Sequence, residues 1–265
     1  MGENLGQHFL KDKEALEAIV AAGDVSSHDT VLEVGPGEGV LTSPLLEAGA
    51  KVIAVEKDPA LVSELQEKFS SQIADGQLEV HESDIRDLSI KDLIGDTEYK
   101  VIANIPYYLT GKLIQTTLSD QHQPTQVVLL IQKEVAERII AANGKESILS
   151  LSVKAYGTPE ITRIVPPESF EPAPRVESAV IKITAISRDF FSDLDEEDFF
   201  SLIKRGYGHK RKTLANNLDT DPRFNKKQAE KVLTEMSLSK RIRAEKLSTT
   251  DWKQLNQKLL QNTSS

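Results

Sequence analysis

Residues 30–41 read Thr-Val-Leu-Glu-Val-Gly-Pro-Gly-Glu-Gly-Val-Leu, an apolar run that ends in three closely spaced glycines. The near-continuous run of Val31, Leu32 and Val34 is typical of a strand buried on both faces of a sheet. Glycines let the backbone turn sharply and approach a ligand closely, and a helix opening near Val40 would offer unpaired N–H groups. We therefore expect a strand, a ligand-binding turn and a helix here.

The spacing of the glycines argues against a dinucleotide cofactor. Gly35, Gly37 and Gly39 form a G-x-G-x-G pattern, whereas the dinucleotide fingerprint is G-x-G-x-x-G. Glu33 adds a carboxylate that would repel a pyrophosphate but suits an aminoacyl group or a sulfonium-bearing cofactor. Glu56 ends the next expected strand, 21 residues after Gly35, close to the spacing at which an acid reaches a ribose diol.

Strands and helices alternate along the first part of the chain. Further apolar strands are expected at residues 78–81, 100–103 and 126–131. The alternation predicts an α/β fold with a mostly parallel, doubly wound sheet that binds ligands at the carboxyl ends of its strands. Gly35, Glu56 and Asp84 all fall at such ends, so we expect them in one site.

The fourth expected strand delivers Asn-Ile-Pro-Tyr-Tyr, residues 104–108, to the same edge of the sheet. Pro106 lacks a backbone donor and has a fixed φ, so the loop presents carbonyl oxygens and the Asn104 amide. Tyr107 and Tyr108 provide rings that could stack on a planar base. An Asn-x-Pro sequence is also a common turn opener, and the stretch alone leaves that alternative open.

A proline-rich connection, residues 166–175, lies between two more expected strands at residues 161–165 and 179–184. Several prolines in one connection make it stiff, and this one could hold Phe170 at the sheet rim.

Charge and pattern change along the chain. The formal charge is −9, yet from Ser201 onward 15 basic residues stand against 6 acidic ones. This asymmetry suggests that one part of the molecule binds a polyanion. Beyond residue 186 the apolar pattern is helical only, so we expect domains over residues 1–186 and 187–265. The densest basic cluster, which also contains Tyr207, comprises Lys204, Arg205, Lys210, Arg211 and Lys212.

Composition excludes several classes of protein. The absence of cysteine rules out disulfides, thiolate zinc sites and a cysteine nucleophile. The longest purely apolar runs, such as residues 127–131, are far too short to span a membrane, and no basic segment leads into an apolar one at the N-terminus. We expect a cytoplasmic protein that does not associate with membranes.

Six stretches together resemble the KsgA-type ribosomal RNA adenine dimethyltransferases, in that family's order and nearly from end to end. They are Asn-Leu-Gly-Gln-His-Phe-Leu (4–10), Glu-Val-Gly-Pro-Gly-Glu-Gly (33–39), Asn-Ile-Pro-Tyr (104–107), Phe-Glu-Pro-Ala-Pro-Arg-Val-Glu-Ser (170–178), Lys-Arg-Lys-Thr-Leu (210–214) and Arg-Ala-Glu-Lys-Leu-Ser (243–248). The resemblance implies a Rossmann-like methyltransferase domain, residues 1–186, and a small all-α domain, residues 187–265, that binds RNA or the ribosome.

The resemblance also implies an activity. The cofactor would be S-adenosylmethionine, with S-adenosylhomocysteine as product and no metal. The reaction would be N6,N6-dimethylation of two adjacent adenosines near the 3′ end of small-subunit rRNA, with a role in small-subunit maturation. The partners would be the small ribosomal subunit and its rRNA, and the protein would be a monomer.

Residue roles can be carried over by position. The cofactor-binding residues would be Gln7, His8, Leu10, Gly35, Gly37, Glu56, Asp84 and Asn104. Glu56 would bind the ribose hydroxyls and Asp84 the adenine amino group, while Asn104 would lie between cofactor and target. The catalytic residues would be Asn104, Pro106, Tyr107 and Phe170, and the RNA-binding residues would be the basic cluster defined above.

The chemistry of these residues suits the reaction. The lone pair of an adenine amino group is delocalised into the ring, which makes it a poor nucleophile. The Asn104 side-chain oxygen and the Pro106 carbonyl could accept both N–H bonds and localise that lone pair for in-line displacement. The base must first leave its stack, and stacking on Tyr107 and Phe170 would offset that cost.

Four alternatives come from other classes of protein. A nicotinamide oxidoreductase would not explain residues 104–107 or the glycine spacing. An Erm-type methyltransferase shares fold and chemistry but acts on large-subunit rRNA, and the resemblance at residues 243–248 argues against it. A DNA adenine methyltransferase would need a separate DNA-reading element. A noncatalytic ribosome assembly factor stays open, and single-turnover methyl transfer would separate it from the enzyme.

Overall fold

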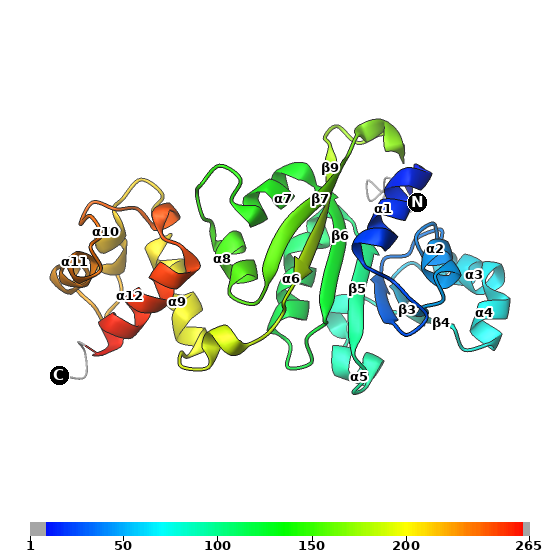
Figure 1. Ribbon diagram of the computed structural model, residues 1–265, viewed down its shortest axis with the longest axis horizontal. Coiled ribbons are helices and arrows are strands. Elements are labelled where there is room, and N and C mark those ends of the chain that lie inside the picture. The colour runs from blue at the N-terminus through cyan, green and yellow to red at the C-terminus, as the bar shows by residue number, and fades with distance from the viewer. Residues whose placement is uncertain (1–8, 262–265) are drawn as a thin grey trace. The chain divides into compact units, whose positions relative to one another are not determined.

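The computed structural model describes residues 9–261 (Figure 1), and the chain forms two compact units. The first comprises the chain up to Glu137 together with Gly157–Ile186, and the second comprises Arg138–Tyr156 together with the chain from Ser187 on. The expected division into 1–186 and 187–265 is therefore wrong for residues 138–156. The physical reason is packing, because Leu151 and Ala155 belong to the same apolar core as the C-terminal helices.

A seven-stranded sheet with the order β4-β3-β2-β5-β6-β9-β7 forms the centre of the first unit. Its strands are β2 (Thr30–Val34), β3 (Lys51–Glu56), β4 (Leu78–Glu82), β5 (Tyr99–Asn104), β6 (Gln126–Gln132), β7 (Thr158–Val165) and β9 (Ser178–Thr184). Five neighbouring strands, β2 to β6, run parallel, and β9 runs antiparallel to both β6 and β7. The predicted mostly parallel, doubly wound sheet is confirmed.

Helices cover both faces of this sheet. They are α1 (Lys13–Ala22), α2 (Thr42–Glu47), α3 (Pro59–Lys68), α4 (Ser70–Ala74), α5 (Ile90–Ile94) and α6 (Thr110–Ser119). A further helix, α7 (Lys133–Ile140), runs from the first unit into the second. Apolar side chains of α1, α2 and α3 share one core cluster with strand residues such as Val31, Ala54 and Ile102. Because the crossovers from β2 to β3 and from β5 to β6 run in opposite directions, right-handed connections place α2 and α6 on opposite faces.

The reversal of strand order between β2 and β5 positions the site. The segments that leave these two neighbouring strands diverge to opposite faces, and a crevice opens at their carboxyl ends. A separate two-stranded antiparallel sheet joins β1 (Phe9–Leu10) to β8 (Phe170–Glu171), with Leu10 opposite Phe170. This pair brings the proline-rich connection beside the start of the described chain.

Local sequence explains the helix boundaries. The Asp12 side chain accepts the Glu14 N–H at 3.0 Å and caps α1, and Asp58 caps α3. Residues 59–74 form two helices, α3 and α4, and not one continuous helix. Phe69 leaves helical geometry at φ −111°, and its ring is buried in the core.

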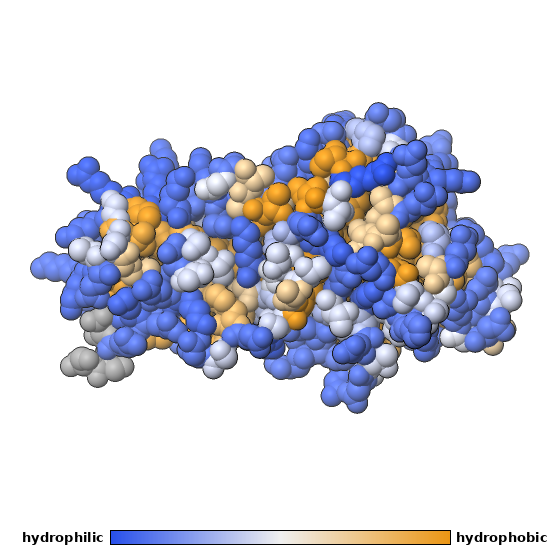
Figure 2. Space-filling view, viewed as in Figure 1, coloured by the Kyte–Doolittle hydropathy of each residue, from blue (hydrophilic) through white to orange (hydrophobic). Residues whose placement is uncertain are grey.

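The second unit is built from helices in the described part of the chain. They are α8 (Ile148–Lys154), α9 (Glu196–Gly206), α10 (Leu214–Leu218), α11 (Lys226–Glu235) and α12 (Thr249–Gln261). Their apolar faces enclose a core around Trp252 and Phe199, which are both fully buried. Polar side chains cover most of the face seen in Figure 2, as expected when apolar residues fill the two cores. Within residues 9–261, no helix combines the length and apolar character needed to cross a bilayer.

Candidate active site

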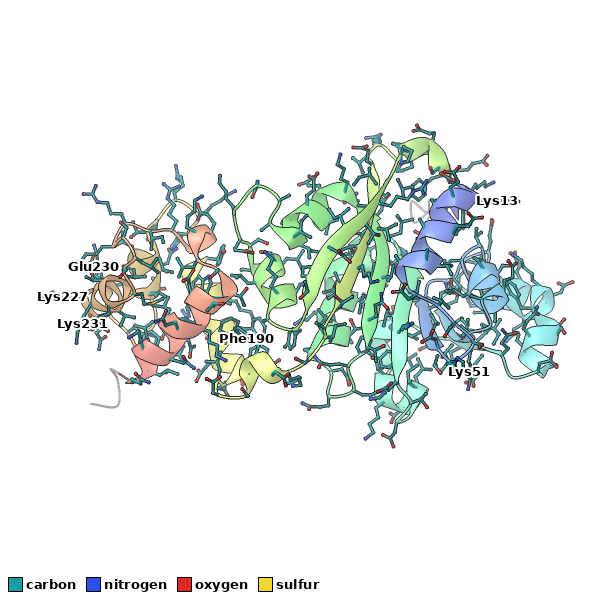
Figure 3. All side chains as sticks on the ribbon, viewed as in Figure 1. Lys13, Lys51, Phe190, Lys227, Glu230 and Lys231 are labelled. Atoms are coloured by element: carbon teal, nitrogen blue, oxygen red, sulfur yellow. The ribbon has the colours of Figure 1, made fainter. Side chains whose placement is uncertain are left out.

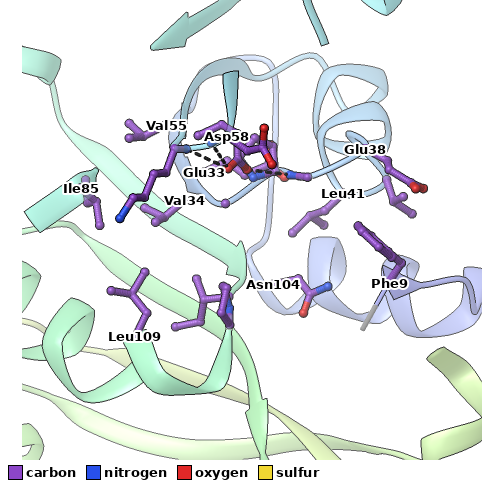
Figure 4. A pocket seen from close by; sticks show the side chains of 18 of the residues that line it. Phe9, Glu33, Val34, Glu38, Leu41, Val55, Asp58, Ile85, Asn104 and Leu109 are labelled. Carbon is purple, nitrogen blue, oxygen red and sulfur yellow. Dashed lines mark hydrogen bonds between the residues drawn. The ribbon is translucent and has the colours of Figure 1, made fainter. Parts of the chain in front are cut away.

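A cavity of about 400 Å³ lies in the first unit at the carboxyl ends of β2 to β5 (Figure 4). It is lined by all the described residues that the sequence predicted for cofactor and target, namely Leu10, Gly35, Gly37, Glu56, Asp84, Asn104, Pro106, Tyr107 and Phe170. The predicted Gln7 and His8 lie outside the described residues. The structure thus brings together segments that are up to 160 residues apart in the chain, from Leu10 to Phe170.

The three glycines of the turn donate their backbone N–H groups to acceptors within the protein. Gly35, Gly37 and Gly39 all have positive φ angles, of 69°, 57° and 73°. Their N–H groups donate to the Val55 carbonyl (2.9 Å), the Glu56 carboxylate (3.2 Å) and the Pro36 carbonyl (2.9 Å). The helix begins only at Thr42, two residues after Val40, and the three glycine N–H groups already have acceptors within the protein.

What the glycines supply is space. A Cβ at Gly35 would lie 3.7 Å from the Pro106 ring, and a Cβ at Gly37 would lie 3.6 Å from the Phe9 ring. Both positions border the cavity, so side chains there would fill part of it. The turn is accordingly a cradle that admits a ligand close to the backbone.

Glu56 joins the glycine turn to the end of β3. Only 7% of the residue is exposed. One carboxylate oxygen accepts the N–H groups of Lys57 (2.8 Å) and Asp58 (3.0 Å), and the other accepts that of Gly37. The oxygen facing Gly37 carries this single bond, so it retains acceptor capacity for a hydroxyl group of a ligand.

Glu33 lies beneath the turn and is 1% exposed. Burial raises the pKa of Glu33 to about 8; the nearby Glu56 carboxylate acts in the same direction, and the bond from the Thr42 hydroxyl, at 2.7 Å, opposes it. The side chain is therefore mostly a neutral acid at pH 7. The expectation that Glu33 contributes a negative charge is wrong for the free protein.

Asp84 already has two cationic partners. Its Oδ1 accepts from the backbone N–H (3.0 Å) and Nε (2.9 Å) of Arg86, and its Oδ2 accepts from Arg86 Nη2 and lies 3.2 Å from Lys57 Nζ. The hydrogen bonds from Arg86 are the main reason that the pKa of Asp84 lies well below its usual range. An adenine amino group would therefore have to share or displace one of these donors. The sequence analysis overlooked Lys57 and Arg86, although each follows within two residues of a strand-end acid.

Asn104 ends β5 and is half-buried. Its side chain makes no hydrogen bond to a described residue, and in the view of Figure 4 it lies between Leu109 and Phe9. The Pro106 carbonyl accepts the Leu109 N–H at 2.9 Å and keeps its second lone pair. Asn104 is thus available to a ligand.

The two predicted aromatic residues are differently placed. The Tyr107 hydroxyl is 2.9 Å from the Ser178 hydroxyl, which fixes the ring beside the cavity. Phe170 lines the same cavity but is only 6% exposed, so it offers little surface to a base.

The basic cluster belongs to the second unit. Lys204 and Arg205 lie in the last turn of α9, while Lys210, Arg211 and Lys212 precede α10, whose N-cap is Thr213. All five side chains are exposed, and none forms an ion pair with another residue in the range 9–261.

Tyr207 does not extend this surface. Its ring stacks on Trp252 with centroids 6.0 Å apart, and burial raises the pKa of its hydroxyl. The ring therefore packs within the second unit and is not presented beside the basic cluster.

Comparison with known proteins identifies the family of this chain. It matches the family described as ribosomal RNA adenine dimethylase over residues 2–259. It is 39% identical over 254 residues to the ribosomal RNA small subunit methyltransferase A of Dehalococcoides mccartyi (strain CBDB1), with 96% of this chain and 86% of that protein covered. This chain belongs to the ribosomal RNA adenine dimethylase family. The predicted family is confirmed, as is the enzyme class, an rRNA adenine methyltransferase that depends on S-adenosylmethionine.

A further relative and two solved structures are similar to this chain over most of its length. The ribosomal RNA small subunit methyltransferase A of Halothermothrix orenii is 36% identical, with 93% of this chain and 84% of the relative covered. A dimethyladenosine transferase from Plasmodium falciparum has a TM-score of 0.79 and 28% identity, with 95% of this chain and 98% of that one covered. The 23S rRNA methyltransferase ErmE has a TM-score of 0.74 at 21% identity, covering 95% and 99%, and shares the fold of this dimethylase.

Proposed function

We propose that the protein transfers methyl groups from S-adenosylmethionine to N6 of two adjacent adenosines near the 3′ end of small-subunit rRNA, during maturation of the subunit. The observation that carries the proposal is the free Asn104 amide, in one cavity with Glu56 and the glycine turn. The choice of subunit is supported by relatives at 34–39% identity that are named as small-subunit enzymes. For the Erm-type alternative, the likeness to ErmE at 21% identity supports the fold alone.

The cavity fits the cofactor. About 400 Å³ is within the range of small-molecule sites. Gly35 and Gly37 would border the methionine portion, and the Glu56 oxygen that faces Gly37 would accept from a ribose hydroxyl. When bound, the cofactor supplies an electrophilic methyl group on a sulfonium. Leu10 and Phe9 lie at the same cavity and would exclude water from it.

Asn104 would act on the target amino group. Its side-chain oxygen would accept one amino N–H, and the free lone pair of the Pro106 carbonyl would accept the other. These two acceptors would localise the nitrogen lone pair and orient it for in-line displacement. The residues are preorganised, since Asn104 ends a central strand and Pro106 is fixed by the Leu109 N–H bond.

Tyr107 would hold the extruded adenine. Extrusion costs a few kcal/mol, and base–aromatic stacking returns about 1–3 kcal/mol per base. The Ser178 bond fixes the ring, so little side-chain entropy is lost on stacking. Phe170 would then close the site from β8 as an apolar wall. The proposal includes a cytoplasmic monomer in which the exposed basic cluster of the second unit contacts rRNA phosphates.

The test is to incubate the protein with methyl-labelled S-adenosylmethionine and either unmethylated small subunits or large subunits, and then to map the labelled bases. We expect label on two adjacent adenosines of small-subunit rRNA, as N6,N6-dimethyladenosine. Label on large-subunit rRNA alone would favour the Erm-type activity. Binding to small subunits without methyl transfer would identify a noncatalytic assembly factor.

A further inference from the structure

Tyr108 stands apart from the other aromatic residues of the cavity. Four large apolar or aromatic side chains are exposed in the described chain, and Tyr108, at 63%, is the most exposed of them. It follows Tyr107 directly and lines the mouth of the cavity. Its hydroxyl makes no hydrogen bond to any residue between 9 and 261. Exposed aromatic surface at a site entrance is typical of a stacking platform.

Two cations accompany this ring. Arg86 and Lys57 also line the cavity, and their side chains are 47% and 66% exposed. Both cations border the same cavity as the Tyr108 ring, and chiefly the hydrogen bonds to Asp84 hold the pKa of Arg86 above its usual range. Arg86 uses Nε and Nη2 on Asp84, which leaves the Nη1 donors for another anion.

The rest of the charged cavity lining is acidic, and the first unit, residues 1–137 and 157–186, has 13 basic and 28 acidic residues, a formal charge of −15. A polyanion that approached this unit would therefore be repelled from most of its surface. The Lys57 and Arg86 side chains are the positively charged groups among the described lining residues. They mark the place where a phosphate can come near the cavity.

We propose that Tyr108, Arg86 and Lys57 form a subsite for the nucleotide next to the adenosine being methylated. The Tyr108 ring stacks on the base of that neighbour, and the two cations face its phosphate. The inference rests on the proposed function, in which two adjacent adenosines are modified. Stacking tolerates any base and any methylation state with a free π face, so one platform serves while either adenosine occupies the cavity.

The decisive test removes the ring and the base separately. Small subunits are reconstituted with two forms of rRNA. One carries the intact adenosine pair in its 3′ segment, and in the other an abasic ribose replaces one adenosine of the pair. KM for methyl transfer is then measured for the wild type, Tyr108→Ala and Tyr108→Phe. On intact subunits Tyr108→Ala should raise KM roughly 5–150-fold, the range that base–aromatic stacking supplies, and Tyr108→Phe should stay near the wild type.

The abasic substrate tests whether the effect of Tyr108→Ala depends on the neighbouring base. If the ring stacks on the neighbouring base, the abasic ribose should raise the wild-type KM by the same factor, and Tyr108→Ala should then add nothing. An equal effect of Tyr108→Ala on both substrates, or no effect on either, would overturn the inference. In those cases the wild type still methylates intact subunits, whereas failure of the proposed function would show as no transfer by the wild type.

The cations are tested by salt dependence. Arg86→Gln should make the plot of log affinity for small subunits against log salt shallower by about 0.7, the value for one single-strand phosphate contact. The matched control is Lys51→Gln (Lys51 is labelled in Figure 3), because Lys51 is 46% exposed and also ion-paired, to Glu79, but begins β3 at the opposite end from the cavity. Equal slopes for Arg86→Gln and Lys51→Gln would contradict a phosphate contact at Arg86.

Discussion

The ionisation of Glu33 makes stability depend on pH. The carboxyl is neutral in the folded protein up to a pKa of about 8, whereas in the unfolded chain it ionises near 4.5. Between these values the unfolded chain binds fewer protons, so the free energy of unfolding falls as pH rises, by about 1.4 kcal/mol per pH unit from this group. Glu33→Gln keeps an acceptor for the Thr42 hydroxyl.

We therefore expect Glu33→Gln to remove this part of the slope. Urea unfolding of wild type and variant at about pH 5.5 and about pH 7.5 measures it. The variant should gain stability relative to the wild type at the higher pH. An identical pH dependence of the two proteins would show that Glu33 is ionised in the folded state.

Glu56 is expected to serve both the cofactor and the turn. Glu56→Ala should weaken S-adenosylmethionine binding by about 1.5–3 kcal/mol, the value of hydrogen bonds to a charged group. It should also lower the free energy of unfolding, because the N–H groups of Gly37, Lys57 and Asp58 lose their acceptor. Glu56→Gln keeps one oxygen and should destabilise less. Calorimetric titration would contradict the ribose role if folded Glu56→Ala bound the cofactor as tightly as the wild type.

At the scale of elements, the glycine turn is shaped by packing as well as by backbone angle. A Cβ at Gly39 would lie 2.5 Å from the Phe69 ring and 2.8 Å from a Leu65 methyl group, whereas at Gly76, with the same φ of 73°, it would meet nothing within 4 Å. Gly76→Ala should cost about 1–2 kcal/mol of stability from left-handed strain alone. Gly39→Ala should cost a further 1–3 kcal/mol or so from overpacking.

Urea unfolding of the two variants separates these effects. A larger loss for Gly39→Ala is expected, together with weaker cofactor binding, because the glycine turn and the end of α3 would have to move apart. Equal losses would show that backbone strain alone explains the glycine.

The sequence was most informative about elements with clear patterns. Residues 30–34, 51–56 and 100–103 are short apolar runs with turn signals at both ends, and each forms a central strand. No helix was predicted over residues 110–119, although α6 lies there. The sequence TGKLIQTTLS mixes β-branched residues with glycine, and buried Leu113 and Ile114 hold it against the sheet, so tertiary packing decides its state.

Tertiary contacts also limited the prediction of the site. Which residues meet in the cavity followed from strand order, because carboxyl ends of parallel strands share one edge. Hydrogen-bond partners did not follow. The N–H groups of the glycine turn, the Asp84 oxygens and the Tyr207 ring each have partners that lie far away in the sequence or depend on exact register.

At the scale of the whole molecule, charge is divided between parts of the chain, and the exposed cluster of the second unit should carry RNA affinity. Replacing Lys210, Arg211 and Lys212 with alanine should weaken small-subunit binding and reduce its salt slope by about 0.7–0.9 per lost phosphate contact. Cofactor affinity should not change, since the cavity is lined by the first unit only.

A triple variant of α11 is the matched control. Lys226, Lys227 and Lys231 supply the same charge in the same unit, and two of them pair with Glu230 and Glu235 (Figure 3 labels Lys227, Glu230 and Lys231). Alanine at these three positions should leave the slope nearly unchanged. If both triple variants lower it equally, net charge rather than the cluster before α10 attracts the RNA.

The central claim is that Asn104 acts on the target amino group in this cavity. The measurement is single-turnover methyl transfer to unmethylated small subunits at saturating cofactor, with cofactor and subunit affinities determined separately. Asn104→Ala should lower the rate of methyl transfer far more than it lowers the affinity for cofactor or subunit, because the interaction matters most in the transition state. Asn104→Asp should retain more activity than Asn104→Ala because it keeps an acceptor oxygen. Transfer by Asn104→Ala at the wild-type rate would contradict the account, since the loop would then be structural.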